Sequence, residues 1–286
     1  MRWVVTGAGG MLGAEVVELL AAREQDVVVA LSRDRLDVTD PDAVLLALRG
    51  ADVVVNCAAF TAVDDAESDE ACAAEVNSLA PRLLAAAARE VGARLVHVST
   101  DYVFGASDPS DGPIPTSAPT APRSAYGRTK EAGERAVRAE LEDHLIVRTA
   151  WLYGAKGGCF PRTIAALAAQ REHVDVVDDQ VGQPTWAKDL AELLVRLVDA
   201  GVPPGTYHGT ASGKASWFEF AREVVRSAHL PAERVGPCAS TAFPRPAPRP
   251  AWSVLAHDAL RRAGVAPIGD WRERWRAAAD EVLSGP

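Results

Sequence analysis

Short apolar runs alternate with longer segments of helical periodicity over the first 150 residues. The runs are rich in β-branched residues and carry almost no charge; they occupy residues 3–7, 27–32, 52–59, 94–100 and 144–151. Strands of this composition are typical of a parallel sheet that helices cover on both faces. The Ala-, Leu- and Glu-rich segments between them predict the covering helices, at 11–23, 41–50, 67–92 and 124–144. The chain is therefore predicted to be an α/β protein with a doubly wound parallel sheet.

The pattern loosens after about residue 150. Helices are expected near 160–171, up to 201, from 216 and at the end of the chain, with short strands at 173–177 and 206–210. We expect one domain at 1–150 and a smaller lobe at 151–286, with some elements returning to the first sheet. The Pro-rich run at 241–252 is either packed, as the following Trp and amphipathic helix suggest, or a free linker or ligand segment.

Composition and charge exclude several classes of protein. The 286 residues are 48% apolar, enough for a substantial core, and carry a net charge of −9 without a long Lys/Arg block. A nucleic-acid or membrane-surface partner is therefore not expected. The four cysteines are dispersed without a CxxC pair, and the chain opens directly on a strand without a leader or membrane span. These features predict a cytoplasmic protein with reduced cysteines.

A glycine-rich turn joins the first predicted strand to the first predicted helix. "VVTGAGGMLG" places Gly7, Gly10 and Gly13 three residues apart. Glycines at such positions permit a tight turn, close approach of backbone N–H groups to a pyrophosphate, and close packing of helix on strand. The pattern in this context predicts a dinucleotide site; the alternative is a glycine turn without a ligand.

The end of the second strand bears on the choice of dinucleotide. An acidic residue there binds the ribose 2′-OH of NAD, whereas an arginine accommodates the 2′-phosphate of NADP. Here the strand ends with Ser32 and Arg33, which favours NADPH, although the following Asp34 leaves NADH open. Asp37 and Val38 are expected to flank the adenine.

Small residues end the third strand. Cys57, Ala58 and Ala59 would leave room for the cofactor along the carboxyl edge of the sheet, where ligands bind in this architecture. Tight packing of a helix against the strand would use small residues equally well.

A tyrosine and a lysine four residues apart begin the helix predicted after the fourth strand. Tyr126 and Lys130 in "YGRTKEAGE" are expected beside Ser99, Thr100 and Asp101 at the end of that strand. Alone, such a pair is more often a surface contact; next to a dinucleotide turn it predicts carbonyl reduction. The ketone oxygen gains negative charge and needs a proton donor, Tyr126, and a second hydrogen bond, from Thr100. Lys130 is expected to lower the tyrosine pKa from about 10 and to bind the nicotinamide ribose.

The ordered motifs resemble one family over nearly the whole chain. "TGAGGMLG", "NCAAFTAVDDAE", "STDYVFG", "YGRTKEAGE", "RTAWLYG", "DDQVGQPT", "SW" and "RPAPRPAWSVL" resemble the dTDP-4-dehydrorhamnose reductases, which are extended short-chain dehydrogenase/reductases. The resemblance implies a Rossmann-like domain, a nucleotide-sugar lobe, a dTDP-linked 4-keto-6-deoxy sugar as substrate, and a homodimer as one assembly. It also implies the Thr100/Tyr126/Lys130 triad, substrate contacts from Asp101, Trp151 and Arg249, and further cofactor contacts from Met11, Leu12 and Thr61.

The chain departs from the family pattern at several positions. Ser32 stands where the family often has an acidic residue, and Cys159 replaces an Asn before Phe160. Some members bind magnesium through carboxylates that include one matching Glu15. Lys188 occupies another of these ligand positions, so no metal site is predicted.

Three alternatives remain open at this stage. A 4,6-dehydratase or 4-epimerase shares the fold, but dehydratases typically have Thr-Asp-Glu where Tyr102 follows Thr100 and Asp101. A non-catalytic NADP-binding regulatory subunit also shares the fold, although the intact triad argues against it. The chain could also reduce a related dTDP-4-keto sugar.

Overall fold

A parallel sheet forms the centre of the molecule. The computed structural model describes residues 1–105, 107, 110 and 112–285. Within this part of the chain, six strands lie in the order β10-β5-β4-β3-β1-β2, and each neighbouring pair is parallel. They are β1 (Arg2–Thr6), β2 (Val27–Leu31), β3 (Val53–Asn56), β4 (Arg94–Thr100), β5 (His144–Thr149) and β10 (Gly205–His208). This order confirms the predicted doubly wound α/β sheet.

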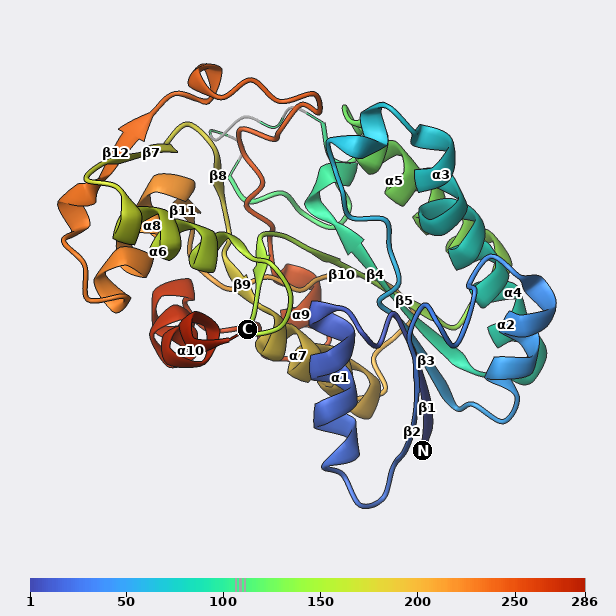
Figure 1. Cartoon of the computed structure of the whole chain (residues 1–286). Coiled ribbons are helices and arrows are strands. Elements are labelled where there is room, and N and C mark those ends of the chain that lie inside the picture. The colour runs from blue at the N-terminus through green and yellow to red at the C-terminus, as the bar shows by residue number, and fades with distance from the viewer. Residues whose placement is uncertain (106, 108–109, 111, 286) are drawn as a thin grey trace.

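Helices cover both faces of the sheet (Figure 1). On one face lie α1 (Met11–Ala21) and α7 (Ala187–Asp199); on the other lie α2 (Pro41–Leu48), α4 (Ala80–Val91) and α5 (Ala125–Glu140). Because side chains alternate along a strand, β1 contributes to two separate cores. Trp3 and Val5 pack with α1, whereas Val4 packs with α2 and α4. None of the helices described is both long and apolar enough for a membrane span.

The helix predicted at 67–92 is divided in the structure. A 3₁₀ turn (η1, Asp65–Glu67) and α3 (Glu70–Ala74) precede a π-helical turn (η2, Glu75–Leu79), and α4 follows. Pro81 has no N–H to donate to the carbonyl four residues earlier, that of Asn77, so regular α-helical bonding cannot continue through this point.

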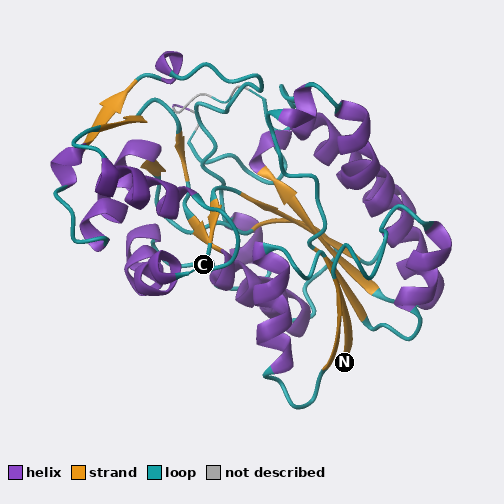
Figure 2. Ribbon diagram, viewed as in Figure 1, coloured by secondary structure: helices purple, strands orange, loops and turns teal. Residues whose placement is uncertain are grey.

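The second half of the chain forms a lobe of helices and short strands (Figure 2). The strands pair as β6 (Leu152–Tyr153) with β9 (Thr185–Trp186), β7 (Val174–Val177) with β12 (Val235–Cys238), and β8 (Val181–Gly182) with β11 (Ala215–Ser216). The helices are α6 (Phe160–Gln170), α8 (Trp217–Ser227), α9 (Asp258–Arg262) and α10 (Trp271–Ser284). Phe220 lies at the centre, in contact with the rings of Tyr153, Trp271 and Trp275. Strand β10 from this half of the chain pairs with β5.

The Pro-rich segment is packed and is not a free linker. The Ala247 N–H donates to Asp64 Oδ1 at 3.2 Å, on the loop that follows β3. The Ala251 carbonyl accepts from the Val181 N–H at 2.9 Å, in the second lobe. The segment therefore connects the two halves of the molecule.

Two glycines set the distance between α1 and the sheet. Gly7 has φ of +67°, and a Cβ there would collide with the backbone of Ala58 after β3. A Cβ on Gly13 would collide with the Gly7 carbonyl oxygen. The turn can therefore lie against both β3 and α1 only because neither residue has a side chain.

We predict that Gly13→Ala destabilises the unliganded protein by about 1–3 kcal/mol, because backbone must move to admit the methyl group. Urea unfolding measures the change in the free energy of unfolding. Gly9→Ala is the matched control: its Cβ would meet only the Ser32 side chain, at an ordinary 3.6 Å, so stability should not fall. A Gly13→Ala protein as stable as the parent would contradict the packing described.

Candidate active site

The first turn of α1 presents backbone amides that no side chain caps. The helix begins after Gly10, which provides no side-chain cap. The N–H groups of the first turn, including those of Met11 and Leu12, therefore lack the side-chain acceptor that often satisfies them. An anion bound at a helix N-terminus accepts such hydrogen bonds. The turn is thus suited to a dinucleotide pyrophosphate.

The residues after β2 lie at the surface near this turn. The Ser32 hydroxyl donates to the Asp34 carboxylate, which lowers the pKa of Asp34. Arg33 is exposed. Asp37 accepts from the N–H and hydroxyl of Thr39 at 2.9 and 2.6 Å, so its carboxylate organises its own turn. Val38 packs at the edge of the core beneath α2.

The buried side-chain amide of Asn56, at the end of β3, joins this strand to β1. The sequence analysis did not single out this residue. Asn56 Oδ1 accepts from the Thr6 hydroxyl at 2.8 Å and from the Ala58 N–H at 3.0 Å. This places Ala58 and Ala59 beside the glycine turn, and Thr61 follows at the surface. Asn56 stood in the quoted motif, but only the tertiary pairing of β1 with β3 reveals its contacts.

Thr100 and Tyr126 meet at the carboxyl end of β4. The Thr100 hydroxyl donates to Asp101 Oδ1 at 3.0 Å and accepts from the Tyr102 N–H at 3.2 Å. Burial raises the pKa of Tyr126 to about 12, although its hydrogen bond with Thr100 acts in the opposite direction. Two side chains from separate predicted segments are therefore in direct contact.

The start of α5 fixes the position of Tyr126. Ser124 caps the helix by accepting from the Gly127 N–H at 3.1 Å, and the Glu67 side chain accepts from the Ala125 N–H at 2.8 Å. Gly127 lies so close to the Tyr102 carbonyl that a Cβ would collide with it. These contacts bring the first turn of α5 against the end of β4.

Lys130 lies one turn after Tyr126 and is buried, with 2% of its surface exposed. Its Nζ donates to the Val98 carbonyl on β4 at 2.7 Å. Burial lowers the pKa of Lys130 to about 8. The expectation that the lysine lowers the tyrosine pKa is wrong for this structure, because burial dominates at Tyr126 and the ammonium is directed at the strand.

Asp101 directly follows Thr100, just past the end of β4. It is 3% exposed, and burial raises its pKa to about 6. The carboxylate faces the Ser253 hydroxyl, yet its Oδ2 forms no regular hydrogen bond with the part of the chain described. That oxygen is available to a polar group of a ligand.

Arg249 reaches the site from the Pro-rich segment. Its guanidinium donates to Asp64 Oδ2 at 2.8 Å and lies 6.0 Å from the centre of the Tyr102 ring. Tyr102 in turn meets Tyr126 edge to face, with ring centres 5.5 Å apart. A cavity of about 90 Å³ lies here, lined in part by Tyr102, Arg123 and Arg249. The Asp64 contact was not anticipated, because it joins residues 185 positions apart.

Trp151 follows β5 in an uncommon backbone conformation. Its φ is +50°, a region that residues with a side chain seldom occupy. The indole stacks on that of Trp217, with ring centres 3.5 Å apart and planes 5° apart, and Gly182 packs against it. Trp217 lay within a quoted motif, but its partner could not be read from the sequence.

Two residues at positions that the resemblance assigns to a magnesium site, Lys188 and Glu15, lie among other charged side chains. Lys188 Nζ lies 3.4 Å from Glu281 Oε2. Burial raises the pKa of Glu15, the candidate ligand on α1, while Lys156 lowers it. Across the described ranges, no group of three or more His, Cys, Asp or Glu side chains converges on one point.

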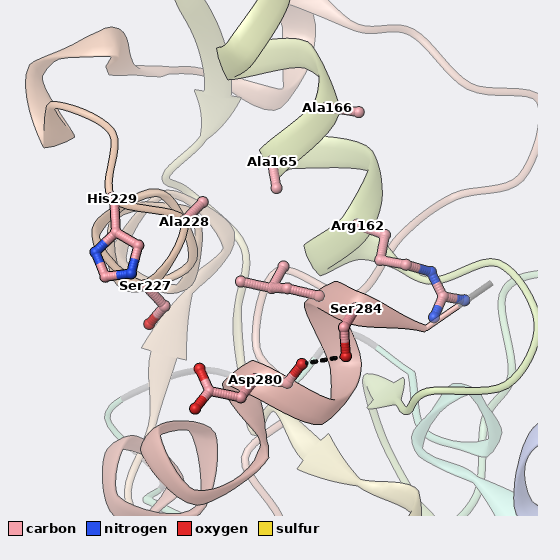
Figure 3. A pocket seen from close by; sticks show the side chains of 9 residues that line it. Arg162, Ala165, Ala166, Ser227, Ala228, His229, Asp280 and Ser284 are labelled. Atoms are coloured by element: carbon pink, nitrogen blue, oxygen red, sulfur yellow. Dashed lines mark hydrogen bonds between the residues drawn. The ribbon is translucent and has the colours of Figure 1, made fainter.

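A wider hollow of about 810 Å³ lies elsewhere, between α6, α8 and α10 (Figure 3). It contains none of the predicted site residues. Arg162 at its edge donates to the Ala155 carbonyl at 2.7 Å, and Ser284 donates to the Asp280 carbonyl at 2.6 Å. Because the predicted site residues lie elsewhere, the size of the hollow does not mark the candidate active site.

Known proteins resemble this chain over almost its full length. A probable dTDP-4,6-dihydroxy-2-methyloxan-3-one 4-ketoreductase from Streptomyces antibioticus is 51% identical, covering 99% of this chain and 96% of the relative. A dTDP-4-dehydrorhamnose reductase from Mycolicibacterium smegmatis is 46% identical over 99% of this chain and 86% of the relative. A dTDP-4-dehydrorhamnose reductase from Bacillus anthracis, solved in complex with NADP, has a TM-score of 0.93 and 35% identity, covering 98% and 99% of the two chains.

The family match agrees with these relatives and with the arrangement of the site. It extends over residues 1–284, nearly the whole chain, and so includes both the glycine turn and the Arg249 segment. The chain belongs to the RmlD substrate binding domain family.

Proposed function

We propose that this protein is an NADPH-dependent reductase of the C4 ketone in a dTDP-4-keto-6-deoxyhexose, with dTDP-4-dehydrorhamnose as the first candidate substrate. The observation that carries the proposal is the meeting of Thr100, Tyr126 and Lys130 at the carboxyl end of β4. The substrate class is that of the two reductases at 51% and 46% identity. The name of the first of these makes a related dTDP-4-keto sugar the second candidate substrate.

In this proposal, Tyr126 is the proton donor to the ketone oxygen. Its raised pKa of about 12 keeps the phenol protonated at neutral pH, so the proton is available for donation. The Thr100 hydroxyl supplies a second hydrogen bond to the same oxygen, where negative charge develops. Lys130 holds the nicotinamide ribose and contributes positive charge nearby. Tyr126 and Thr100 thus act on the ketone oxygen, and Lys130 acts on the cofactor beside it.

The dinucleotide is held by the turn and strand ends already described. Bound NADPH supplies the hydride. The amides of Met11 and Leu12 at the start of α1 bind its pyrophosphate, which lies over the turn that contains Gly7 and Gly10, and Ser32 with Arg33 receives the 2′-phosphate. Asp37 and Val38 flank the adenine, and Ala58, Ala59 and Thr61 line the rest of the site. The NADP complex of the Bacillus anthracis relative supports this choice of cofactor.

The sugar nucleotide is bound between the sheet and the second lobe, residues 151–286. Asp101 offers a buried oxygen to the sugar, Trp151 lies against the sugar nucleotide, and Arg249 binds the diphosphate. Arg249 is bound to Asp64 at 2.8 Å in the unliganded chain, so the diphosphate must compete with that carboxylate. Elimination chemistry is disfavoured, because the third residue of the strand-end motif is Tyr102 rather than an acid.

We propose a cytoplasmic location, which the cysteines support. All four are free thiols in the structure, as expected in a reducing compartment. A homodimer remains a prediction of the family resemblance, which sedimentation of the purified protein would resolve.

Tyr126→Phe should lower kcat by roughly 10²- to 10⁴-fold, because it removes the proton donor and keeps the ring. Turnover of the 4-keto sugar measures kcat. Dinucleotide titration measures the affinity for NADPH, which should change little. Tyr207→Phe is the matched control, since Tyr207 lies on β10 and its hydroxyl donates to the Pro203 carbonyl, away from the site. A Tyr126→Phe enzyme that turns over at the parent rate would exclude the mechanism.

Arg33→Ala should remove most of the preference for NADPH over NADH, because the 2′-phosphate loses its cation. The ratio of kcat/KM for the two cofactors is the measurement. Arg35→Ala, at an exposed arginine two residues away, should leave the ratio unchanged. An enzyme that prefers NADH, or whose preference does not respond to Arg33, would overturn the assignment.

Treatment with EDTA should leave turnover unchanged, because Lys188 and Glu281 neutralise one another where a cation would otherwise be needed. The assay compares chelated enzyme with enzyme given excess magnesium. Activity that EDTA abolishes and magnesium restores would show that the metal interpretation is wrong.

A further inference from the structure

A second buried charge lies one helical turn beyond Lys130. Glu134 is 0% exposed, and its carboxylate accepts from Arg148 Nε at 2.8 Å and Arg148 Nη2 at 2.7 Å. Arg148 is 2% exposed. Burying two charges has a large desolvation cost, and apolar residues of similar size often serve stability as well. Neither residue has a part in the proposed chemistry, so the presence of this pair calls for an explanation.

The fold brings this pair to the strand segment that receives Lys130. Lys130 and Glu134 are four residues apart on α5 and therefore share a helix face. Lys130 Nζ binds the Val98 carbonyl, and Arg148 on β5 is in register with the next residue of β4, Ser99. The carboxylate of Glu134, held by Arg148, thus lies at the same level of the sheet as the lysine.

Cys57, His97 and Tyr126, which surround Lys130, are neutral near pH 7; Asp101, beyond Thr100, has a pKa of about 6 and is ionised. Burial raises the pKa of the Cys57 thiol, after β3, to about 12, and lowers the pKa of His97, on β4, well below its usual value. Burial likewise raises the pKa of Tyr126 to about 12. Burial alone would raise the pKa of Glu134. The hydrogen bonds and the charge of Arg148 outweigh burial and lower this pKa to about 2.

Glu134 is therefore the charged side chain that most affects the pKa of Lys130. That carboxylate raises the pKa of Lys130 against the larger, opposite effect of burial. Arg148 and Arg138 both donate to this carboxylate, with Arg138 Nη2 at 2.8 Å from Glu134 Oε2. They keep Glu134 ionised and fixed in place.

We propose that Glu134, clamped by Arg148, is a positioning residue for the active site: its carboxylate keeps the Lys130 side chain protonated and directed at the end of β4. A simple brace between α5 and β5 would use the same two side chains, but it would not depend on the charge of Glu134. The role in catalysis rests on the proposed reductase function; the effect on Lys130 does not.

The test measures Lys130 directly in the unliganded protein. The chain contains four lysines, so ¹³Cε-lysine NMR resolves each one, and the signal missing from Lys130→Met identifies the active-site residue. In the parent protein, Lys130 should titrate with a midpoint of about 8. Glu134→Gln should move that midpoint to lower pH by about one unit or more, because the neighbouring anion is lost. The alkaline limb of kcat/KM should move with it.

Two further variants keep the result interpretable. Glu134→Gln combined with Arg148→Met removes both buried charges and so avoids an unpaired Arg148 if the single variant does not fold; its Lys130 midpoint should also fall. Glu131→Gln removes a neighbouring charge that pairs with Arg135 at 3.0 Å, and it should leave the midpoint in place.

An unchanged Lys130 midpoint in the folded Glu134 variants would overturn the proposal, as would an equal shift in Glu131→Gln. If the midpoint falls as expected but the parent protein reduces no 4-keto sugar, the proposed function fails and the link between Glu134 and Lys130 stands. If the parent reduces the sugar and the midpoint does not move, the proposed function stands and the link between Glu134 and Lys130 fails.

Discussion

The parallel register of β1, β3, β4 and β5 is the constraint on which the site depends. Because these strands run in one direction, their last residues lie at the same edge of the sheet; these are Thr6, Asn56, Thr100 and Thr149. Thr6 is in register with Asn56, and their side chains are hydrogen-bonded at 2.8 Å. Thr100 is in register with Thr149, directly before the segment that carries Trp151. The glycine turn and Thr100, the proposed carbonyl-binding residue, are thus placed at one edge by backbone pairing.

Helix α5 adds the proposed catalytic residues to this edge. Its first turn is fixed by Ser124 and Glu67, and Gly127 lets it approach the chain after β4 closely enough for Tyr126 to meet Thr100. The same helix carries Lys130 and Glu134, both buried against the sheet. Burial has opposite consequences for the groups involved: it keeps the tyrosine protonated and makes the lysine easier to deprotonate. The carboxylate of Glu134 acts against burial at the lysine, because it raises the pKa of Lys130.

Much of the architecture could be predicted from local sequence. Apolar runs located the sheet strands, and the spacing of Gly7, Gly10 and Gly13 marked the turn between β1 and α1. The π-helical turn at Glu75–Leu79 was missed because periodicity continues through Pro81. Local patterns also cannot show which distant side chains meet, as Asp64 and Arg249 do, or Trp151 and Trp217. The tyrosine pKa was misjudged for a related reason: the lysine four residues away is visible in the sequence, but the burial of the phenol is not.

The central claim is that this site transfers hydride to C4 of a dTDP-linked 4-keto sugar. The most direct measurement supplies the purified protein with dTDP-4-dehydrorhamnose and NADPH that carries deuterium at C4 of the nicotinamide on the transferred face. The account predicts one deuterium on the sugar product, located by NMR at C4, with loss of a C4 proton signal. Product without deuterium, deuterium at another carbon, or no reduction of any 4-keto dTDP-sugar would contradict it.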